Sequence, residues 1–67
     1  MKNKIKYYRE LKGWSQEELA KHSDVSRTTI SGLENETINV TTNTSMDKIS
    51  DALGVSTIEL FYTWNVQ

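Results

Sequence analysis

The chain has 67 residues, of which 36% are hydrophobic, and a formal net charge of −1. This length suits one domain, and no apolar run is long enough for a membrane span or a signal-peptide core, so we expect an unexported, cytoplasmic protein. Without cysteine, and with a single histidine, the chain has no ligand set for a metal. No nucleophile–base pairing is apparent either, so we expect neither a cofactor nor an enzyme.

The charge is distributed unevenly along the chain. In the first twelve residues the only acid is Glu10, whereas the basic residues are Lys2, Lys4, Lys6, Arg9 and Lys12. The acidic overall balance argues mildly against a nucleic-acid partner, because phosphate contacts usually come with a basic surplus. The basic N-terminal segment either reaches a DNA backbone or serves only as a solvated surface.

Three helix starts share one device, an apolar residue before a serine and another four positions after that serine. The three sets are Trp14-Ser15 with Leu19, Val25-Ser26 with Ile30, and Val55-Ser56 with Leu60. This spacing is typical of a hydrophobic staple around an N-cap. Glu18 and Glu59 stand three residues after Ser15 and Ser56, where a capping box needs them.

The remaining elements follow from apolar spacing and glycines. Ile5, Tyr8 and Leu11 mark one stripe of a first helix that stops at Gly13, and Met46, Ile49 and Leu53 mark a fourth helix that ends at Gly54. We predict one all-α domain over residues 1–67, with helices at 3–12, 16–22, 27–34, 43–53 and 57–62. The polar stretch 35–45 is predicted to be mostly loop, and the alternating tail 62–67 a short strand or a docked coil.

Residues 15–34 describe two short helices joined by a tight turn. Leu19, Val25, Ile30 and Leu33 are predicted to face inward, and Ala20 is small enough for the second helix to cross closely. Asp24 occupies the turn, where its short polar side chain tolerates a left-handed backbone. The pattern predicts a helix-turn-helix. Trp14 and Phe61 are expected in the core, and His22 is expected to be a plain helix-end residue.

The outer face of the second helix of this pair carries hydrogen-bonding side chains. Arg27 has the geometry for guanine O6 and N7, and Thr28 and Ser31 suit a base edge or a phosphate. Alternatively, Arg27 is an ordinary solvated residue and the two hydroxyls bond only to their own helix. Gln16, beside the unpaired N–H groups that open the preceding helix, has a side-chain amide placed to clamp a phosphate.

Several spaced motifs together resemble the Cro/phage-repressor (XRE-like) helix-turn-helix family. They are Arg9, Ser15-Gln-x-x-Leu-Ala, Val25-Ser with Ile30, Leu33-Glu-Asn, and Ile49-x-x-Ala-Leu-Gly-Val-Ser-x-x-Glu-Leu-Phe61. The resemblance runs from about residue 5 to residue 61. It implies a five-helix domain that binds operator double-stranded DNA as a homodimer, usually to control transcription.

The resemblance also implies roles for individual residues. Gln16 and Asn35 would contact phosphates, and Arg9 would pair with Glu34 to brace the first helix against the DNA-reading helix, although an exposed pair worth under about 1 kcal/mol is the alternative. Alternatively, Asn35 serves only as a C′ cap, although that role is compatible with a phosphate contact. We also expect Thr29 and Asn39 to contact phosphates.

Three positions depart from the family's pattern. Gly32 stands where the family often has a third base-reading side chain, so either the base contacts are fewer or the backbone approaches DNA more closely. The loop after Glu34 contains Glu36 and no Lys or Arg, which should weaken phosphate binding. Asp24 replaces a frequent turn glycine at a small cost in stability.

The C-terminal tail has two alternative roles, covering the helices or forming a dimer. A DNA reader of this size usually needs two copies, so we expect a two-fold interface at Ile58, Tyr62, Trp64 and Val66. We predict a sequence-specific transcriptional regulator, most simply a repressor on an inverted-repeat operator. An antitoxin that also binds a toxin, and a protein-interaction domain that kept the fold without DNA binding, remain alternatives, with a toxin or an inducer as the protein partner.

Overall fold

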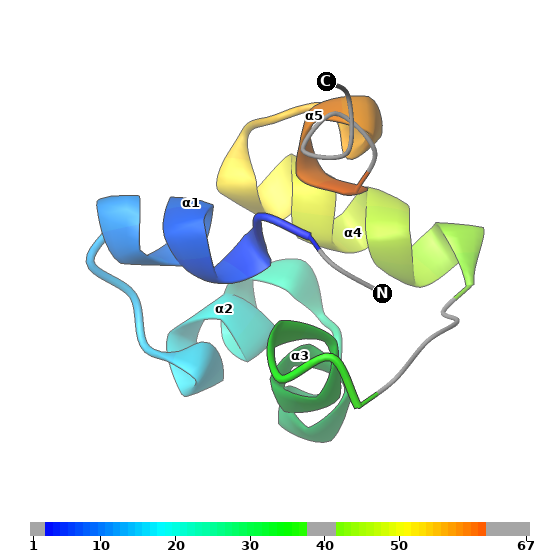
Figure 1. Cartoon of the computed structure of the whole chain (residues 1–67). Coiled ribbons are helices and arrows are strands. Elements are labelled where there is room, and N and C mark those ends of the chain that lie inside the picture. Colours follow the sequence, from blue (N-terminus) through cyan, green and yellow to red (C-terminus); the bar gives the residue numbers. More distant parts are fainter. Residues whose placement is uncertain (1–2, 38–41, 62–67) are drawn as a thin grey trace.

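The computed structural model describes residues 3–37 and 42–61, which form five α-helices (Figure 1). In chain order they are α1 (Ile5–Leu11), α2 (Gln16–Ser23), α3 (Arg27–Glu34), α4 (Asn43–Leu53) and α5 (Thr57–Phe61). The predicted all-α architecture is confirmed, and α1 begins two residues later than expected. The tail 62–67, predicted as a strand or coil, lies outside the described residues. Within the described part of the chain, no helix is long and apolar enough to cross a membrane.

Side-chain hydroxyls cap the N-termini of four of these helices. Ser15 Oγ accepts from the Glu18 N–H while Glu18 Oε1 accepts from the Ser15 N–H at 2.8 Å, which completes the predicted capping box and lowers the pKa of Glu18. Ser26 caps α3 through the Thr29 N–H, and Ser56 Oγ accepts from the Glu59 N–H at 3.0 Å. Thr42 caps α4 in the same way, a start that the staple pattern did not reveal.

Left-handed residues follow four of the described helices. Gly13 and Gly54 have φ values of +73° and +74°, and Asp24 has φ +59° in the turn between α2 and α3, as the sequence predicted. The alternative role considered for Asn35, the C′ cap of α3, does not hold. Asn35 keeps a helical conformation (φ −86°), and Glu36 takes the left-handed one (φ +61°), because the helical turn closes one residue later.

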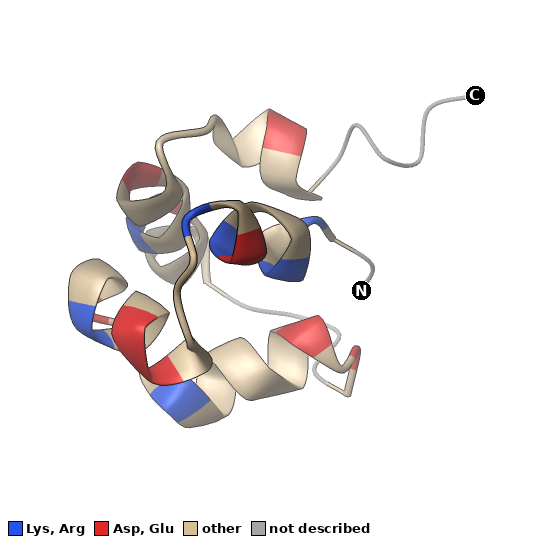
Figure 2. Ribbon diagram, turned by 90° about the vertical axis from the view of Figure 1, so that its left-hand side faces the viewer, with Lys and Arg blue, Asp and Glu red and all other residues tan. Residues whose placement is uncertain are grey.

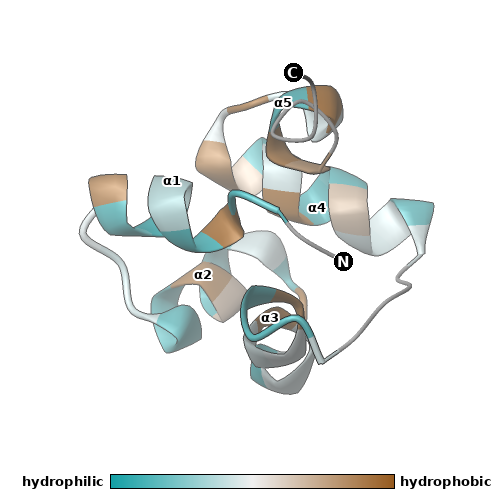
Figure 3. Cartoon of the chain, in the orientation of Figure 1, coloured by the Kyte–Doolittle hydropathy of each residue, from teal (hydrophilic) through white to brown (hydrophobic). Residues whose placement is uncertain are grey.

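The core is formed by apolar side chains from all five helices and from the turn before α3. Figure 3 shows the hydrophobic segments gathered where the helices face one another. The buried apolar residues are Ile5, Leu19, Val25, Ile30, Leu33, Met46, Ile49, Leu53, Leu60 and Phe61. Trp14, predicted in the core, is half-buried against it.

One residue of the apolar stripe predicted for α1, Leu11, does not face the core. Leu11 is 66% exposed, while Arg9, two residues earlier, is buried. Leu11 is the last residue of α1, and Figure 1 shows this end of the helix running out past its neighbours, so its side chain has no opposing helix to pack against. The buried face of α1 therefore consists of an aliphatic residue and a cation, Ile5 and Arg9.

The remaining helices hold the α2–α3 pair in place. Helix α4 packs against α2, α1 contacts both α3 and α4, and α5 covers α4 on the far side from α3 (Figure 1). The Lys4 N–H donates to the Leu60 carbonyl at 2.9 Å, which joins the start of α1 to α5. This packing leaves one side of α3 at the surface of the domain.

Candidate nucleic-acid interface

Helix α3 has two distinct faces. Ile30 and Leu33 are fully buried, whereas Arg27 and Thr28 are exposed and Ser31 is half-exposed. Within the described residues, the side chains of Arg27 and Thr28 make no hydrogen bond or ion pair. The buried face fixes the rotation of the helix about its axis, so these polar groups are presented outward by a firmly packed element.

Thr29, predicted as a phosphate contact, belongs to the cap of α3. Its N–H donates to Ser26 Oγ at 3.2 Å, and its hydroxyl accepts from the Ser26 hydroxyl at 2.9 Å. Thr29 is also half-buried. Its hydroxyl therefore already takes part in the cap that begins α3, and its contact with a phosphate stays a prediction.

A hollow of about 390 Å³ opens beside the outer face of α3. It is lined by Arg27, Thr28, Ser31, Gly32 and Thr37. The three polar residues predicted to read bases therefore border one surface depression, together with the backbone at Gly32. Thr37 also lines the hollow, although it was not among the predicted site residues.

Thr37 is brought there by the turn that follows α3. Its N–H and its hydroxyl both donate to the Gly32 carbonyl, at 2.9 and 3.3 Å, after the left-handed residue Glu36 reverses the chain. A threonine a few residues past a helix end gives little sequence signal, because the reversal depends on a glutamate in a conformation that favours glycine or asparagine.

Arg9 and Glu34 form a bidentate, nearly buried ion pair. Arg9 Nε donates to Glu34 Oε2 at 2.7 Å and Arg9 Nη2 donates to Glu34 Oε1 at 3.0 Å. Arg9 Nη1 also donates to the Trp14 carbonyl at 2.6 Å. Glu34 raises the pKa of Arg9 above its ordinary value by accepting these bonds. One guanidinium thus joins α1, the segment before α2 and the last residue of α3.

Gln16 differs from the expectation in one respect. Its amide is not free, because Nε2 donates to Glu34 Oε1 at 3.1 Å. This bond holds the Gln16 side chain at the first turn of α2, beside the end of α3. It also fixes the orientation of the side-chain amide, and so of its carbonyl oxygen. Asn35 is tethered similarly, since its Nδ2 donates to Ser31 Oγ at 3.3 Å. The phosphate contacts of both residues stay predictions.

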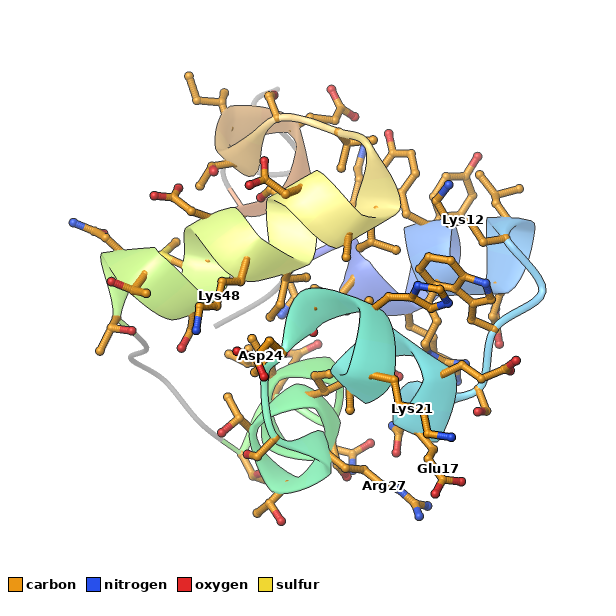
Figure 4. All side chains as sticks on the ribbon, turned by 180° about the vertical axis from the view of Figure 1, so that it is seen from behind. Lys12, Glu17, Lys21, Asp24, Arg27 and Lys48 are labelled. Carbon is orange, nitrogen blue, oxygen red and sulfur yellow. The ribbon has the colours of Figure 1, made fainter. Side chains whose placement is uncertain are left out.

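The charges around this face are few and mixed. In the view of Figure 2, basic and acidic segments are interspersed over the described helices. In Figure 4, Arg27 of α3 and Lys21 and Glu17 of α2 project from the same side of the helix-turn-helix unit, while Lys48 lies near Asp24 at 3.5 Å. Lys21 and Arg27 are therefore the cations nearest to the outer face of α3 among those that the figure labels.

His22 is more than a plain helix-end residue. Its ring stacks on Trp14 with centroids 4.1 Å apart and planes 7° from parallel, and Lys12 Nζ lies 5.3 Å from the Trp14 ring centroid. The stack covers the half-buried indole at the junction of α1 and α2. His22 therefore has a packing role that its sequence context did not indicate.

The residues predicted for the dimer interface are only partly described. Ile58 is 63% exposed on α5, away from the core. Tyr62, Trp64 and Val66 lie outside the described residues, as does Asn39, the fourth residue predicted to contact phosphates.

Comparison with known proteins identifies the same fold. A helix-turn-helix family model matches residues 5–60. A hypothetical transcription factor of Neisseria meningitidis is 38% identical over 56 residues, which are 84% of this chain and 52% of that protein. An uncharacterized HTH-type transcriptional regulator of Methanocaldococcus jannaschii is 59% identical over 34 residues, 51% of this chain and 52% of that protein.

A solved structure agrees with these matches. The crystal structure of hypothetical transcription factor NHTF from Neisseria superposes with a TM-score of 0.74 at 36% identity, covering 82% of this chain and 61% of the other. The chain spans about half the length of the curated relatives it matches. It belongs to the Cro/C1-type helix-turn-helix family.

Proposed function

We propose that this protein is a sequence-specific double-stranded DNA-binding transcriptional regulator that inserts α3 in the major groove. The observation that carries the proposal is the division of α3 between Ile30 and Leu33, fully buried, and Arg27 and Thr28, which face outward. An α-helix fits the major groove, where arginine reads guanine and threonine reads a base edge or a thymine methyl. The printed names of the relatives, a transcription factor and a transcriptional regulator, support this role.

In the proposed complex, groups at the helix ends hold the phosphates. The first turn of α2 offers unpaired backbone N–H groups next to Gln16, which Glu34 keeps in place. Asn35, at the end of α3, and Thr29, at its start, flank the reading face; Asn39 is proposed to join them. With Lys21 and Arg27 as the nearby cations, the electrostatic share of the affinity is small.

We further propose that two copies bind an inverted repeat and repress transcription. One α3 contacts too few base pairs for useful specificity, and a two-fold pair places two recognition helices about 34–36 Å apart, one turn of DNA. Ile58, a large apolar side chain left exposed on α5, supports an interface there. Tyr62, Trp64 and Val66 are proposed to extend it.

The test is a titration of the purified chain against DNA from upstream of its own gene, at several salt concentrations. We expect a specific complex whose affinity falls with salt. The logarithm of the association constant should decrease with the logarithm of the salt concentration, with a slope of about −0.9 per phosphate neutralised. Arg27→Ala should lower the specific affinity by about tenfold or more, since a bidentate base contact contributes roughly 1–3 kcal/mol. Lys48→Ala removes one positive charge at a site away from the reading face, so it should change the affinity for DNA little.

Two outcomes would overturn the proposal. Equally weak binding to all DNA, unchanged by Arg27→Ala, would favour a protein-interaction domain that kept the fold. Specific DNA binding combined with a tight complex between the chain and a neighbouring gene's toxin would instead favour an antitoxin.

A further inference from the structure

We propose that Asn3 is a positioning residue for DNA binding, because its side-chain amide holds the turn through which the chain leaves α3. This inference rests on the proposed function, and it adds a residue from the start of the described chain to those that govern the complex. The turn contains Asn35, a proposed phosphate contact, and Thr37, which borders the hollow beside the reading face. By holding the turn, Asn3 sets where these two side chains stand relative to the DNA.

The Asn3 amide joins the start of α1 to the end of α3, which lie beside each other in Figure 1. Asn3 Oδ1 accepts from the Ile5 N–H at 3.0 Å, and Nδ2 donates to the Leu33 carbonyl at 2.9 Å. A carbonyl only accepts and an N–H only donates, so the two ends of the amide are not interchangeable. Lys4, the residue before α1, caps the helix with no side-chain bond, so Asn3 supplies one.

The turn that Asn3 holds is a Schellman motif with an unfavourable residue in it. The Thr37 N–H donates to the Gly32 carbonyl at 2.9 Å. The Glu36 N–H donates to the Leu33 carbonyl at 3.2 Å, and these two bonds define the motif. Its left-handed position usually has glycine or asparagine, but here it is Glu36, with φ +61°. The strain of this glutamate opposes the turn, so the turn depends on further bonds that hold it closed.

Two side chains supply such bonds, one to each carbonyl of the motif. Thr37 Oγ1 donates to the Gly32 carbonyl at 3.3 Å, from within the turn itself. Asn3 Nδ2 donates to the Leu33 carbonyl from thirty residues away in the chain. Of these two bonds, the one from Asn3 ties the turn to another helix, so it fixes the place of the turn as well as its conformation.

Asn3 and Arg9 hold two successive residues at the end of α3, with different consequences. Arg9 binds the Glu34 carboxylate, whereas Asn3 binds the backbone at Leu33. A bond to a side chain positions the helix but leaves the path of the chain beyond it undetermined. The bond from Asn3 acts on a carbonyl of the turn, so it favours the closed turn directly.

The first experiment measures the turn without DNA, by amide hydrogen exchange followed with NMR. In Asn3→Ser the hydroxyl can still accept from the Ile5 N–H, but no atom replaces Nδ2. We expect the Thr37 amide to exchange about three- to tenfold faster, the equivalent of one hydrogen bond, while the core amide of Ile49 keeps its rate. Asn43→Ser, the same change at an exposed position on α4, should leave both rates unaltered. An unchanged rate at Thr37, or equal acceleration at both amides, would overturn the inference.

The second experiment measures the affinity for an operator duplex selected from random DNA. We expect Asn3→Ser to lower this affinity about two- to fivefold, because only molecules with a closed turn present Asn35 to the phosphate. Glu36→Gly relieves the left-handed strain, whereas Glu36→Ala removes the same charge and keeps the strain. The loss of affinity caused by Asn3→Ser should therefore disappear in the Glu36→Gly background and persist in the Glu36→Ala background.

The outcomes separate this inference from the function on which it rests. Specific binding by the wild type, matched by equal operator affinity in Asn3→Ser, would overturn the inference and leave the proposed function intact. A loss of the same size in both Glu36 backgrounds would also overturn it, because Asn3 would then act on DNA binding by a route other than the turn. If selection yields no specific duplex at all, the positioning role fails together with the proposed function.

Discussion

Arg9 of α1 and Glu34 of α3 are joined by two hydrogen bonds of 2.7 and 3.0 Å, with side chains only 11% and 2% exposed. The same carboxylate accepts from Gln16, and the same guanidinium donates to the Trp14 carbonyl. A pair so shielded from water is costly to break, because either partner alone would be a buried, uncompensated charge. The end of the proposed DNA-reading helix is therefore positioned by α1 and α2 together.

The first prediction concerns the stability that depends on this pair. We expect Arg9→Leu to lower the free energy of unfolding by about 3 kcal/mol, because it leaves the Glu34 carboxylate buried without its cation. The double variant Arg9→Leu with Glu34→Leu should recover a large part of that loss. Urea denaturation of both single variants and the double variant completes the cycle.

Lys6→Leu is the matched control, since it removes an exposed cation from the same helix and should change the free energy of unfolding little. Strict additivity of the two single losses in the double variant would show that the pair contributes no coupling.

A second prediction follows from the contact between α1 and α5. The Tyr8 hydroxyl donates to Glu59 Oε2 at 2.7 Å, and Lys4 Nζ lies 3.5 Å from the same oxygen. The hydrogen bond from Tyr8, and next the charge of Lys4, hold the pKa of Glu59 below its ordinary 4.5. The folded state thus binds fewer protons than the unfolded state, so this contribution to stability is present above about pH 4.5 and is lost as the pH falls through the folded pKa.

Thermal unfolding between about pH 6 and pH 3 should show this loss, and it should be smaller in Tyr8→Phe. It should not vanish, because Glu18 in the capping box also has a lowered pKa. Tyr7→Phe, which changes the exposed neighbour, should keep the full acid dependence. An identical pH dependence in Tyr8→Phe and the wild type would show that the bond does not influence the titration of Glu59.

The fold follows closely from short-range sequence signals. The staples and caps at Ser15, Ser26 and Ser56 predict helix starts that depend on bonds within four residues, and the structure has them there. Apolar spacing was a weaker guide for α1. Ile5 and Leu11 look equivalent in periodicity, yet only Ile5 meets opposing helices, and that depends on tertiary packing.

The site was harder to predict because its details depend on side chains far apart in the chain. The outward face of α3 could be read from Ile30 and Leu33 alone. Two hydrogen bonds of the site could not be predicted from the sequence. The bond from Gln16 to Glu34 spans eighteen residues, and the bond from Thr37 to the Gly32 carbonyl follows an unexpected left-handed glutamate, Glu36. Neither interaction has a local pattern.

A third prediction concerns two left-handed positions, where substitutions should change the stability in opposite directions. Asp24 has φ +59° and Gly54 has φ +74°, and a side chain at position 54 would meet no described atom beyond its own neighbours in the chain within 4 Å. We expect Asp24→Gly to stabilise the fold by up to about 1 kcal/mol and Gly54→Ala to destabilise it by about 1–2 kcal/mol, because the cost at both sites is conformational. Thermal and urea unfolding measure both changes.

The ion pair of Asp24 with Lys48 does not complicate this comparison, because the Asp24 side chain is 93% exposed and such pairs contribute little. Lys48→Ala, which removes the pair but keeps Asp24, is the control. A loss of stability in Asp24→Gly would mean that the aspartate makes a favourable interaction that outweighs its backbone strain.

The fourth prediction separates base reading from phosphate positioning within the proposed complex. Arg27→Lys keeps the charge but loses the planar fork that matches guanine, so it should lower affinity for the operator by about tenfold and leave affinity for unrelated DNA nearly unchanged. Gln16→Ala removes a side chain that the proposal assigns to a phosphate, so it should weaken binding to both duplexes by a similar factor. Fluorescence anisotropy with the two duplexes at one salt concentration gives both ratios. A Gln16→Ala loss confined to the operator would place Gln16 among the base-reading residues, and an Arg27→Lys loss shared by both duplexes would move Arg27 to the phosphates.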